Sequence, residues 1–239
     1  MTEELFRADS YARHCQALIT AVDERGIQVD RTVFYPLGGG QPGDSGRIVT
    51  ETGAVIVIGD SRRDRETGAH LHIPEGAVTD LAPGMPVSLE IDWQRRYPRM
   101  RMHTCLHLLC AVVDGAVTGG QIGGHGGDGV GRLDFNLPDG GLDKAAIEAD
   151  LNRLIGEDHA IACRWISDAD LVAHPELVRT MSVSPPTGQG RVRLVEVGDV
   201  DLQPCGGTHV RSTAEIGPVV VTKIENKGRR NRRIRLALT

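Results

Sequence analysis

The 239-residue sequence has few aromatic side chains, no long apolar run and no excess of positive charge. Phenylalanine, tryptophan and tyrosine make up 3% of the residues, so the core must be aliphatic. No apolar run approaches the roughly 20 residues that a membrane-spanning helix needs. The first fifteen residues carry acids where a signal peptide has basic and then apolar residues. These absences predict a cytoplasmic globular protein without a membrane partner.

Cysteine is also sparse. The five cysteines are an odd number and lie far apart in the chain: Cys15, Cys105, Cys110, Cys163 and Cys205. That pattern argues against a disulfide framework and suits a reducing compartment. A metal ligand or a buried thiol is the better interpretation of each.

The net charge of −5 excludes a general polyanion binder, so contact with nucleic acid needs a local basic face. Two clusters qualify. They are Arg95, Arg96, Arg99 and Arg101, and the C-terminal cluster Lys223, Lys227, Arg229, Arg230, Arg232, Arg233 and Arg235. Each cluster alone is as consistent with a solvated surface as with a binding face.

Residues 1–92 are predicted to form a small β-barrel domain. Short β-prone runs separated by glycine occur there, at 28–30, 33–34, 48–50, 54–58, 70–73 and 87–91. Regularly spaced short strands are typical of a barrel or sandwich. No helix longer than an N-terminal one is expected in this part.

Residues 93–239 are predicted to form a two-layer α/β domain with a mainly antiparallel sheet, which makes the whole chain α+β. A first helix has Pro98 in its first turn and an apolar interior of Met102, Leu106, Leu109, Ala111 and Val113. A second has Asp143 as its N-cap and buries Ile147, Leu151, Leu154 and Ile155. Glycines from Gly115 to Gly124 are expected to end the first helix. The predicted strands are 132–136, 160–166, 191–197, 219–224 and 232–238.

Two pairs of residues have the spacing of metal ligands. His103 and His107 lie four apart in the predicted helix, where their side chains share one face. Cys205 and His209 enclose two glycines, which let the backbone turn tightly. Each pair alone is weak, but thiolate and imidazole donors together suit zinc. The sequence therefore predicts one zinc ion per chain, either structural or catalytic.

Several motifs occur in an order that resembles a known family. They are Thr32-Val33-Phe34-Tyr35-Pro36-Leu37-Gly38-Gly39-Gly40-Gln41-Pro42-Gly43-Asp44, Met100-Arg101-Met102-His103-Thr104-Cys105-Leu106-His107, Gln121 ahead of Arg132-Leu133-Asp134-Phe135, and Cys205-Gly206-Gly207-Thr208-His209. The sequence resembles the freestanding alanyl-tRNA editing proteins of the AlaX type, which are similar to the editing domain of alanyl-tRNA synthetase. Cys105 stands where that family usually has alanine. The lack of a long C-terminal extension is typical of the medium-length form.

The resemblance implies zinc-dependent removal of serine, and of glycine as a second candidate, from mischarged alanine tRNA. Gln121 would orient substrate or water. Thr208 would touch the amino acid or support the turn around it. Gly38, Gly39, Gly40 and Gln41 would help to select the amino acid, although turn chemistry alone predicts a tight β-turn there. They are no phosphate-binding loop, because no lysine with serine or threonine follows the glycines.

The partner implied is the acceptor end of alanine tRNA, and no obligate protein partner is inferred. Lys227, Arg230 and Arg233 are assigned to tRNA binding. In the last strand, Arg233 and Arg235 would share one face, and Ile234, Leu236 and Leu238 would point inward. The first arginine cluster is the alternative tRNA-binding site.

Two other functions fit part of the pattern. The first is an RNA-binding protein in which zinc only holds the fold together. The second is a zinc peptidase or amidase, but such enzymes usually carry a glutamate between the two helical histidines. Only Thr104, Cys105 and Leu106 lie between His103 and His107. The sequence leaves open the choice between serine and glycine, the tolerance for other tRNAs and the oligomeric state.

Overall fold

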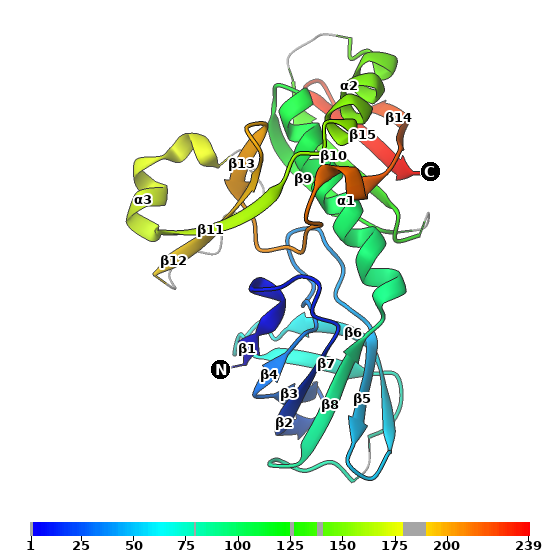
Figure 1. Cartoon of the computed structure of the whole chain (residues 1–239), viewed down its shortest axis with the longest axis vertical. Coiled ribbons are helices and arrows are strands. Elements are labelled where there is room, and N and C mark those ends of the chain that lie inside the picture. The colour runs from blue at the N-terminus through cyan, green and yellow to red at the C-terminus, as the bar shows by residue number, and fades with distance from the viewer. Residues whose placement is uncertain (1, 79, 125–126, 138–140, 179–189) are drawn as a thin grey trace. The chain divides into compact units, whose positions relative to one another are not determined.

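The computed structural model describes residues 2–78, 80–124, 127–137, 141–178 and 190–239 (Figure 1). Most of its regular structure is β-sheet with a few helices, which agrees with the expected α+β class. The chain divides into two compact units, Met1–Tyr97 and Pro98–Thr239. Within the described ranges, no helix is long and apolar enough to cross a membrane.

The first unit contains a closed six-stranded barrel, as expected. Its strands follow one another around the barrel in the order β2-β3-β7-β6-β5-β8. Their bounds are β2 His14–Asp23, β3 Gly26–Val29, β5 Gly46–Thr50, β6 Val55–Arg63, β7 His70–Pro74 and β8 Pro86–Ile91. Outside the barrel, β1 Glu3–Glu4 pairs in parallel with β4 Arg31–Thr32, and a 3-10 helix, η1, spans Leu5–Arg7.

The barrel interior is mainly aliphatic. Along β8, Val87, Leu89 and Ile91 are buried while Glu90 is exposed, so every second side chain points inward. The predicted strand at 33–34 is wrong, because β4 ends at Thr32. The ten-residue β2 was not predicted, since Leu18 points outward between Ala17 and Ile19 and hides the alternation.

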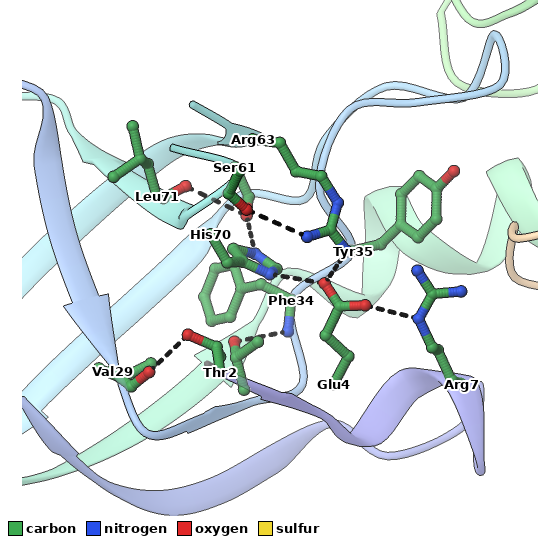
Figure 2. Close-up of polar contacts among 12 residues, drawn as sticks. Thr2, Glu4, Arg7, Val29, Phe34, Tyr35, Ser61, Arg63, His70 and Leu71 are labelled. Atoms are coloured by element: carbon green, nitrogen blue, oxygen red, sulfur yellow. Dashed lines mark hydrogen bonds and ion pairs between the residues drawn. The ribbon is translucent and has the colours of Figure 1, made fainter. Parts of the chain in front are cut away.

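A buried polar network joins the N-terminal residues to the barrel (Figure 2). His70 lies between Glu4 and Ser61, with Nδ1 3.2 Å from the Glu4 carboxylate and Nε2 2.7 Å from the Ser61 hydroxyl. Arg7 and Arg63 also donate to Glu4. A serine, a histidine and an acid in this order resemble a hydrolase relay. Ser61 is fully buried, however, so the network holds β1 and η1 on the barrel and offers no accessible nucleophile.

Two members of the first arginine cluster are buried, which removes them from the alternative RNA-binding face, whereas Arg95 is exposed and Arg101 is half-buried. Arg96 is fully buried, and its Nε donates to both carboxylate oxygens of Asp44 at 3.0 and 2.9 Å. Arg99 is buried as well, with its Nε 2.8 Å from Asp128. A buried guanidinium needs such a carboxylate partner, so these two arginines are neutralised inside the fold and present no positive charge to RNA.

From Trp93 onward, the described residues form two antiparallel sheets and three α-helices, the first of which begins in the last residues of the first unit. The larger sheet has the order β14-β15-β10-β9, and the smaller has β11-β12-β13. The bounds are α1 Trp93–Val112, β9 Ala116–Ile122, β10 Val130–Asn136, α2 Lys144–Gly156, β11 Ile161–Ser167, α3 Asp168–Ala173, β12 Arg191–Val197, β13 Asp201–Pro204, β14 Val219–Asn226 and β15 Asn231–Leu238, with 3-10 helices η2 Pro175–Leu177 and η3 Thr213–Ile216.

The prediction of one sheet for this part is wrong. β12 pairs with β11 on one side and with β13 on the other, whereas β15 lies between β14 and β10 in the larger sheet. β9 was not expected either, because Gly119 and Gly120 look like a helix end. Gly120 instead lies opposite Leu133, and a Cβ added to it would come 2.8 Å from the Leu133 Cδ2. A side chain at this position would have to displace the end of Leu133, so glycine suits the close packing within the sheet.

Both predicted long helices are present. α2 begins at its predicted N-cap, whereas α1 begins earlier than predicted. The Asp143 side chain caps α2 by accepting from the amides of Ala145 and Ala146, as predicted. The apolar face Ile147, Leu151, Leu154 and Ile155 is buried. In α1, Pro98 lies beyond the first turn, because the Asp92 carbonyl accepts from the amides of Arg95 and Arg96 and starts the helix earlier than expected.

Candidate metal centre

α1 presents the two histidines of the first predicted pair. His103 and His107 are both buried, one helical turn apart on the side of α1 next to the Met102 and Leu106 stripe. That stripe packs on the larger sheet, since a Cβ added to Gly131 would come 2.7 Å from the Met102 Sδ and 3.4 Å from the Leu106 Cδ1. Packing of the neighbouring apolar residues therefore fixes the direction in which the histidines point.

The second pair lies in the loop that follows β13. The amide of Cys205 donates to the Arg193 carbonyl at 3.0 Å, which continues the β12–β13 pairing by one residue. The Arg193 guanidinium donates in turn to the carbonyls of Cys205 and Gly207, at 3.0 and 2.9 Å. The amide of Gly207 lies 3.4 Å from the Cys205 sulfur. Backbone contacts on both sides of Gly206 thus hold the loop in shape.

The fold brings these four side chains together from segments about a hundred residues apart. One donor atom from each of His103, His107, Cys205 and His209 lies within 4.8 Å of the other three. The Cys205 Sγ is 3.4 Å from His103 Nε2 and 3.3 Å from His209 Nε2. Such a cluster of one thiol and three imidazoles could hold a metal ion.

Neighbouring polar groups orient two of the imidazoles. His107 Nδ1 lies 3.0 Å from the Asp201 carboxylate, which accepts a hydrogen bond from the Nδ1–H group and leaves Nε2 as a ligand. The Thr104 hydroxyl donates to the Met100 carbonyl at 3.1 Å, so at His209 Nδ1, 3.1 Å away, it acts as acceptor. His209 Nε2 is then also a ligand atom.

Sequence reasoning missed this supporting shell. Asp201 is fixed further by Gln203, whose Nε2 donates to it at 2.8 Å. Asp201 and Gln203 alternate along β13 ahead of Cys205, so they share one side of that strand with the ligand. That alternation is the signal from which both residues could have been found. Thr104 had no comparable signal, because a threonine inside a helix is common.

The electrostatics of the metal-free cluster are those of a thiolate among imidazoles. Burial raises the pKa of Cys205, but the charges of His103 and His209 outweigh it and lower that pKa well below its usual value. For His107, burial is outweighed by the hydrogen bond to Asp201 and by Cys205, which raise the pKa to about 9. Burial lowers the pKa of His209. The cluster therefore favours a deprotonated sulfur, the form that ligates metals.

The other predicted site residues of this unit lie outside the four-ligand cluster. Thr208 is fully buried next to His209, which favours a role in supporting the loop. Gln121 is exposed in β9, where its Oε1 accepts from Arg132 Nε and Nη2 at 3.3 and 3.2 Å. Because Ile122 pairs with Gly131 on the side of α1, Gln121 projects from the opposite face of the sheet.

Gly38 to Gln41, in the first unit, form a tight hairpin turn. Gly38 and Gln41 exchange two backbone hydrogen bonds of 3.1 and 2.9 Å. Gly39 and Gly40 have φ values of 56° and 81°, a left-handed pair that defines a type I′ turn. The Tyr35 hydroxyl donates to the Gly38 carbonyl at 2.9 Å. The β-turn that the sequence allowed is therefore present.

The three predicted tRNA-binding cations differ in their surroundings. Lys227 and Arg230 are exposed, and Lys227 Nζ lies 3.2 Å from Glu225. Arg233 makes two bonds to Asp134, of 2.7 and 2.8 Å. Along β15, Ile234 and Leu236 are buried between less buried arginines, as predicted. Arg233 thus already serves a buried carboxylate within its own sheet.

Comparisons with known proteins relate segments of both units to tRNA synthetases. Residues 192–235 match the family described as the threonyl and alanyl tRNA synthetase second additional domain, and residues 7–95 match class II (A) tRNA synthetases. The class of protein is therefore one related to the aminoacyl-tRNA synthetases.

Full-length relatives narrow this class. The chain is 36% identical to the alanyl-tRNA editing protein AlaX-M of Methanosarcina acetivorans, over 100% of this chain and 99% of the relative. It is 33% identical to the protein of the same name from Saccharolobus solfataricus, over 98% of each. With the alanine–tRNA ligase of Pyrobaculum neutrophilum it shares 33% identity over 94% of this chain and 25% of the ligase. The chain belongs to the AlaX-M family of alanyl-tRNA editing proteins.

Proposed function

We propose that this protein hydrolyses the ester bond of mischarged alanine tRNA, releasing serine and, as a second substrate, glycine, and that it uses one zinc ion. The observation that carries the proposal is the convergence of His103, His107, Cys205 and His209, in a chain whose full-length relatives are named alanyl-tRNA editing proteins.

The donor geometry supports zinc. Zinc binds sulfur at about 2.3 Å and imidazole nitrogen at about 2.0–2.1 Å, so a tetrahedral arrangement separates S and N by about 3.5 Å. The two S–N distances in the cluster are 3.4 and 3.3 Å. Carboxylate or carbonyl donors, which calcium and magnesium prefer, are not among the four. The donor types and these two distances therefore fit zinc.

Zinc in this position would polarise the ester carbonyl and help to align the acylated ribose. Other residues of the chain orient the metal ligands. Asp201 accepts a hydrogen bond from Nδ1 of His107, and Thr104 accepts one from Nδ1 of His209, so both rings keep a fixed orientation. Arg193 holds the Cys205 loop through its carbonyls. A rigid set of ligands positions the substrate more accurately than a mobile one.

The choice of amino acid follows from what a synthetase cannot exclude. A pocket shaped for alanine rejects glycine and serine poorly, because a missing methyl group or an added hydroxyl changes binding by only a few kcal/mol. A second hydrolytic site removes these errors. We assign amino-acid selection to the domain of residues 1–92 through the turn Gly38-Gly39-Gly40-Gln41, and hydrolysis to the domain of residues 93–239. Gln121 and Thr208 remain candidates for contact with substrate or water on the family resemblance alone.

The test compares initial rates of deacylation of seryl-, glycyl- and alanyl-charged alanine tRNA. Seryl-tRNA should be hydrolysed much faster than alanyl-tRNA, and removal of metal by a chelator should abolish hydrolysis until zinc is restored. Equal rates on the seryl and alanyl forms would show that no editing sieve exists.

A second candidate function is RNA binding with a purely structural zinc. The presence of four protein ligands favours it, because four ligands normally close a zinc site. On this alternative the protein would bind charged tRNA and leave all three esters intact. The same deacylation assay therefore decides between the two functions.

A further inference from the structure

The smaller sheet carries an exposed tryptophan beside the metal centre. Trp165, one of only two tryptophans in the chain, lies in β11 with 42% of its surface exposed. An indole is the largest apolar side chain, and such side chains gather at binding surfaces when they are not in the core. Nothing in the proposed reaction so far requires this residue.

An arginine accompanies the indole. The guanidinium carbon of Arg191, in β12, lies 4.6 Å from the centroid of the Trp165 ring, within cation–π range. Trp165 is paired with Arg193, so Arg191 is its diagonal neighbour on the same side of the sheet. An indole with a guanidinium over it offers flat surfaces and a positive charge. An unpaired nucleotide matches these features, because its flat base can stack on them and its phosphate is attracted to the charge.

The pairing of strands links this platform to the metal centre. Trp165 pairs with Arg193 across β11 and β12, and the amide of Cys205 bonds to the Arg193 carbonyl on the other side. Trp165, Arg193 and Cys205 therefore follow one another across three neighbouring strands, which spans about 10 Å at the usual strand spacing. Figure 1 shows β11 and β12 side by side, with α3 following the end of β11.

The platform is also on the correct side of the sheet. Paired residues of antiparallel strands project on the same side. Arg193 shows which side this is, because its guanidinium reaches the Cys205 loop and also lies 3.0 Å from the sulfur of Cys163, two residues before Trp165. Gln203, paired with Val195, reaches the Asp201 carboxylate that holds His107. Trp165 and Cys205 thus lie on the same side of the smaller sheet, with the buried Arg193 between them.

We propose that Trp165 and Arg191 form a stacking platform for an unpaired nucleobase at the 3′ end of the charged tRNA. The inference rests on the proposed function, because it takes the ester to lie at the metal centre. The terminal base is then one ribose away from the ester, and the preceding base one phosphodiester further. Stacking on an aromatic ring accepts any base, and the exposed cation of Arg191 suits the phosphates that join the bases. A protein that bound to the same indole would not require Trp165 to be aligned with Cys205 across the sheet. The end of a tRNA whose ester lies at the metal centre does require that alignment.

Fluorescence tests binding without catalysis. In a Trp93→Phe variant, Trp165 is the only tryptophan, and titration with the RNA tetranucleotide ACCA should quench its emission as the base stacks. The matched control is Trp165→Phe, in which the remaining emission of Trp93 should not change. The difference in quenching between the unmodified protein and Trp165→Phe gives the same answer if Trp93→Phe folds poorly. Absence of quenching at Trp165 would overturn the platform.

Kinetics provide the second test. Trp165→Ala should lower kcat/KM on seryl-charged tRNA about 5- to 150-fold, the range expected for one lost base stack, mainly through KM. Trp165→Phe should retain most of the activity, and zinc content should not change in either variant. Val172→Ala, on α3 with 81% exposure, is a matched surface control and should behave like the unmodified protein.

The outcomes separate this inference from the proposed function. Full deacylation with an unchanged KM in Trp165→Ala would overturn the platform and leave the function standing. Quenching by ACCA in a protein that deacylates none of the charged tRNAs would overturn the function and support the platform as an RNA-end binding site.

Discussion

The carboxylate of Asp201 lies 3.0 Å from Nδ1 of His107, on the side of the imidazole away from the other ligands. Asp201 Oδ2 is the acceptor, so the ring keeps its proton there and turns Nε2 towards the metal position. The pair explains why a buried aspartate precedes the Cys205 loop.

Removal of this charge should weaken metal binding. Asp201→Asn is expected to lower zinc affinity about 10- to 100-fold, the usual cost of losing such a partner. Competition with a chromogenic chelator measures the affinity. Asp199→Asn is the matched control, because that side chain lies two residues away and is almost fully exposed. Equal affinities in Asp201→Asn and Asp199→Asn would remove Asp201 from the site.

Loss of a ligand should lower the zinc stoichiometry itself. Cys205→Ala and His107→Ala are each expected to contain well below one zinc per chain, because three remaining ligands bind the ion less tightly. Elemental analysis after gel filtration measures the content. His174→Ala, at an exposed histidine of the same unit, should retain one zinc. Full occupancy in both ligand variants would contradict the assignment.

The C-terminal cluster should act on tRNA binding and on stability through different residues. Lys227→Ala with Arg230→Ala is expected to raise KM for charged tRNA and to flatten its salt dependence, because two phosphate contacts are lost. Zinc content and unfolding should not change. Arg153→Ala, at an exposed arginine of α2, is the control. An unchanged KM and salt slope in the double variant would make the cluster a solvated surface.

Arg233→Ala is a separate case. Asp134 is 7% exposed, and the hydrogen bond from Arg233 is the main reason that its pKa lies below the usual value. Loss of a partner to a largely buried carboxylate destabilises the sheet, so this variant should unfold at lower urea concentration as well as bind tRNA less tightly. Replacement of Arg233 therefore tests stability together with tRNA binding, whereas replacement of Lys227 and Arg230 tests tRNA binding alone.

The first unit should lose stability as the pH falls below about 6.5. Burial, followed by the charge of His70, lowers the pKa of His72 from 6.5 to about 3. Between these values the unfolded chain binds a proton that the folded chain refuses, so stability is fully present above pH 6.5 and decreases towards pH 3. The slope is at most about 1.4 kcal/mol per pH unit for one group.

Glu4 extends the same trend at lower pH. Burial opposes its ionisation, but the hydrogen bond with His70 and the charges of Arg7 and Arg63 lower its pKa from 4.5 to about 2.

Urea unfolding followed by Trp93 fluorescence at pH 7, 6 and 5 should show the loss of stability caused by His72 first. In His72→Gln the slope over this range should be smaller, whereas His14→Gln, at an exposed residue, should keep it. Equal slopes in both variants would exclude His72 as the source.

The parts of the fold that could be predicted are those that depend on local pattern. The apolar face of α2 and its Asp143 cap follow from helical spacing, and the ligand pairs follow from spacing and donor chemistry. The grouping of strands could not be predicted in this way. Whether β12 pairs with β11 or with β15 depends on contacts between distant residues, which leave no periodic trace in one sequence.

The burial of charged side chains was also not predicted from the sequence. Arg96 and Arg99 look like members of a basic surface because charged residues are usually exposed. Their partners, Asp44 and Asp128, are 52 and 29 residues away, so only the folded chain shows that the charges are neutralised. Asp201 differs from these arginines, because its alternation with Gln203 and Cys205 is visible in the sequence, although its partner His107 lies 94 residues earlier.

The pairing of β2 with β8, in which His14 lies opposite Glu90, governs the order in which the protein can fold during synthesis. The barrel cannot close until residue 90 has left the ribosome, and contacts of such long sequence separation form slowly. α1 begins three residues later, at Trp93. The ribosome therefore releases the two histidines of the metal centre only after every strand of the barrel is available, and the thiol they would meet follows about a hundred residues behind. Folding from the N-terminus would complete the barrel while that cysteine is still unsynthesised.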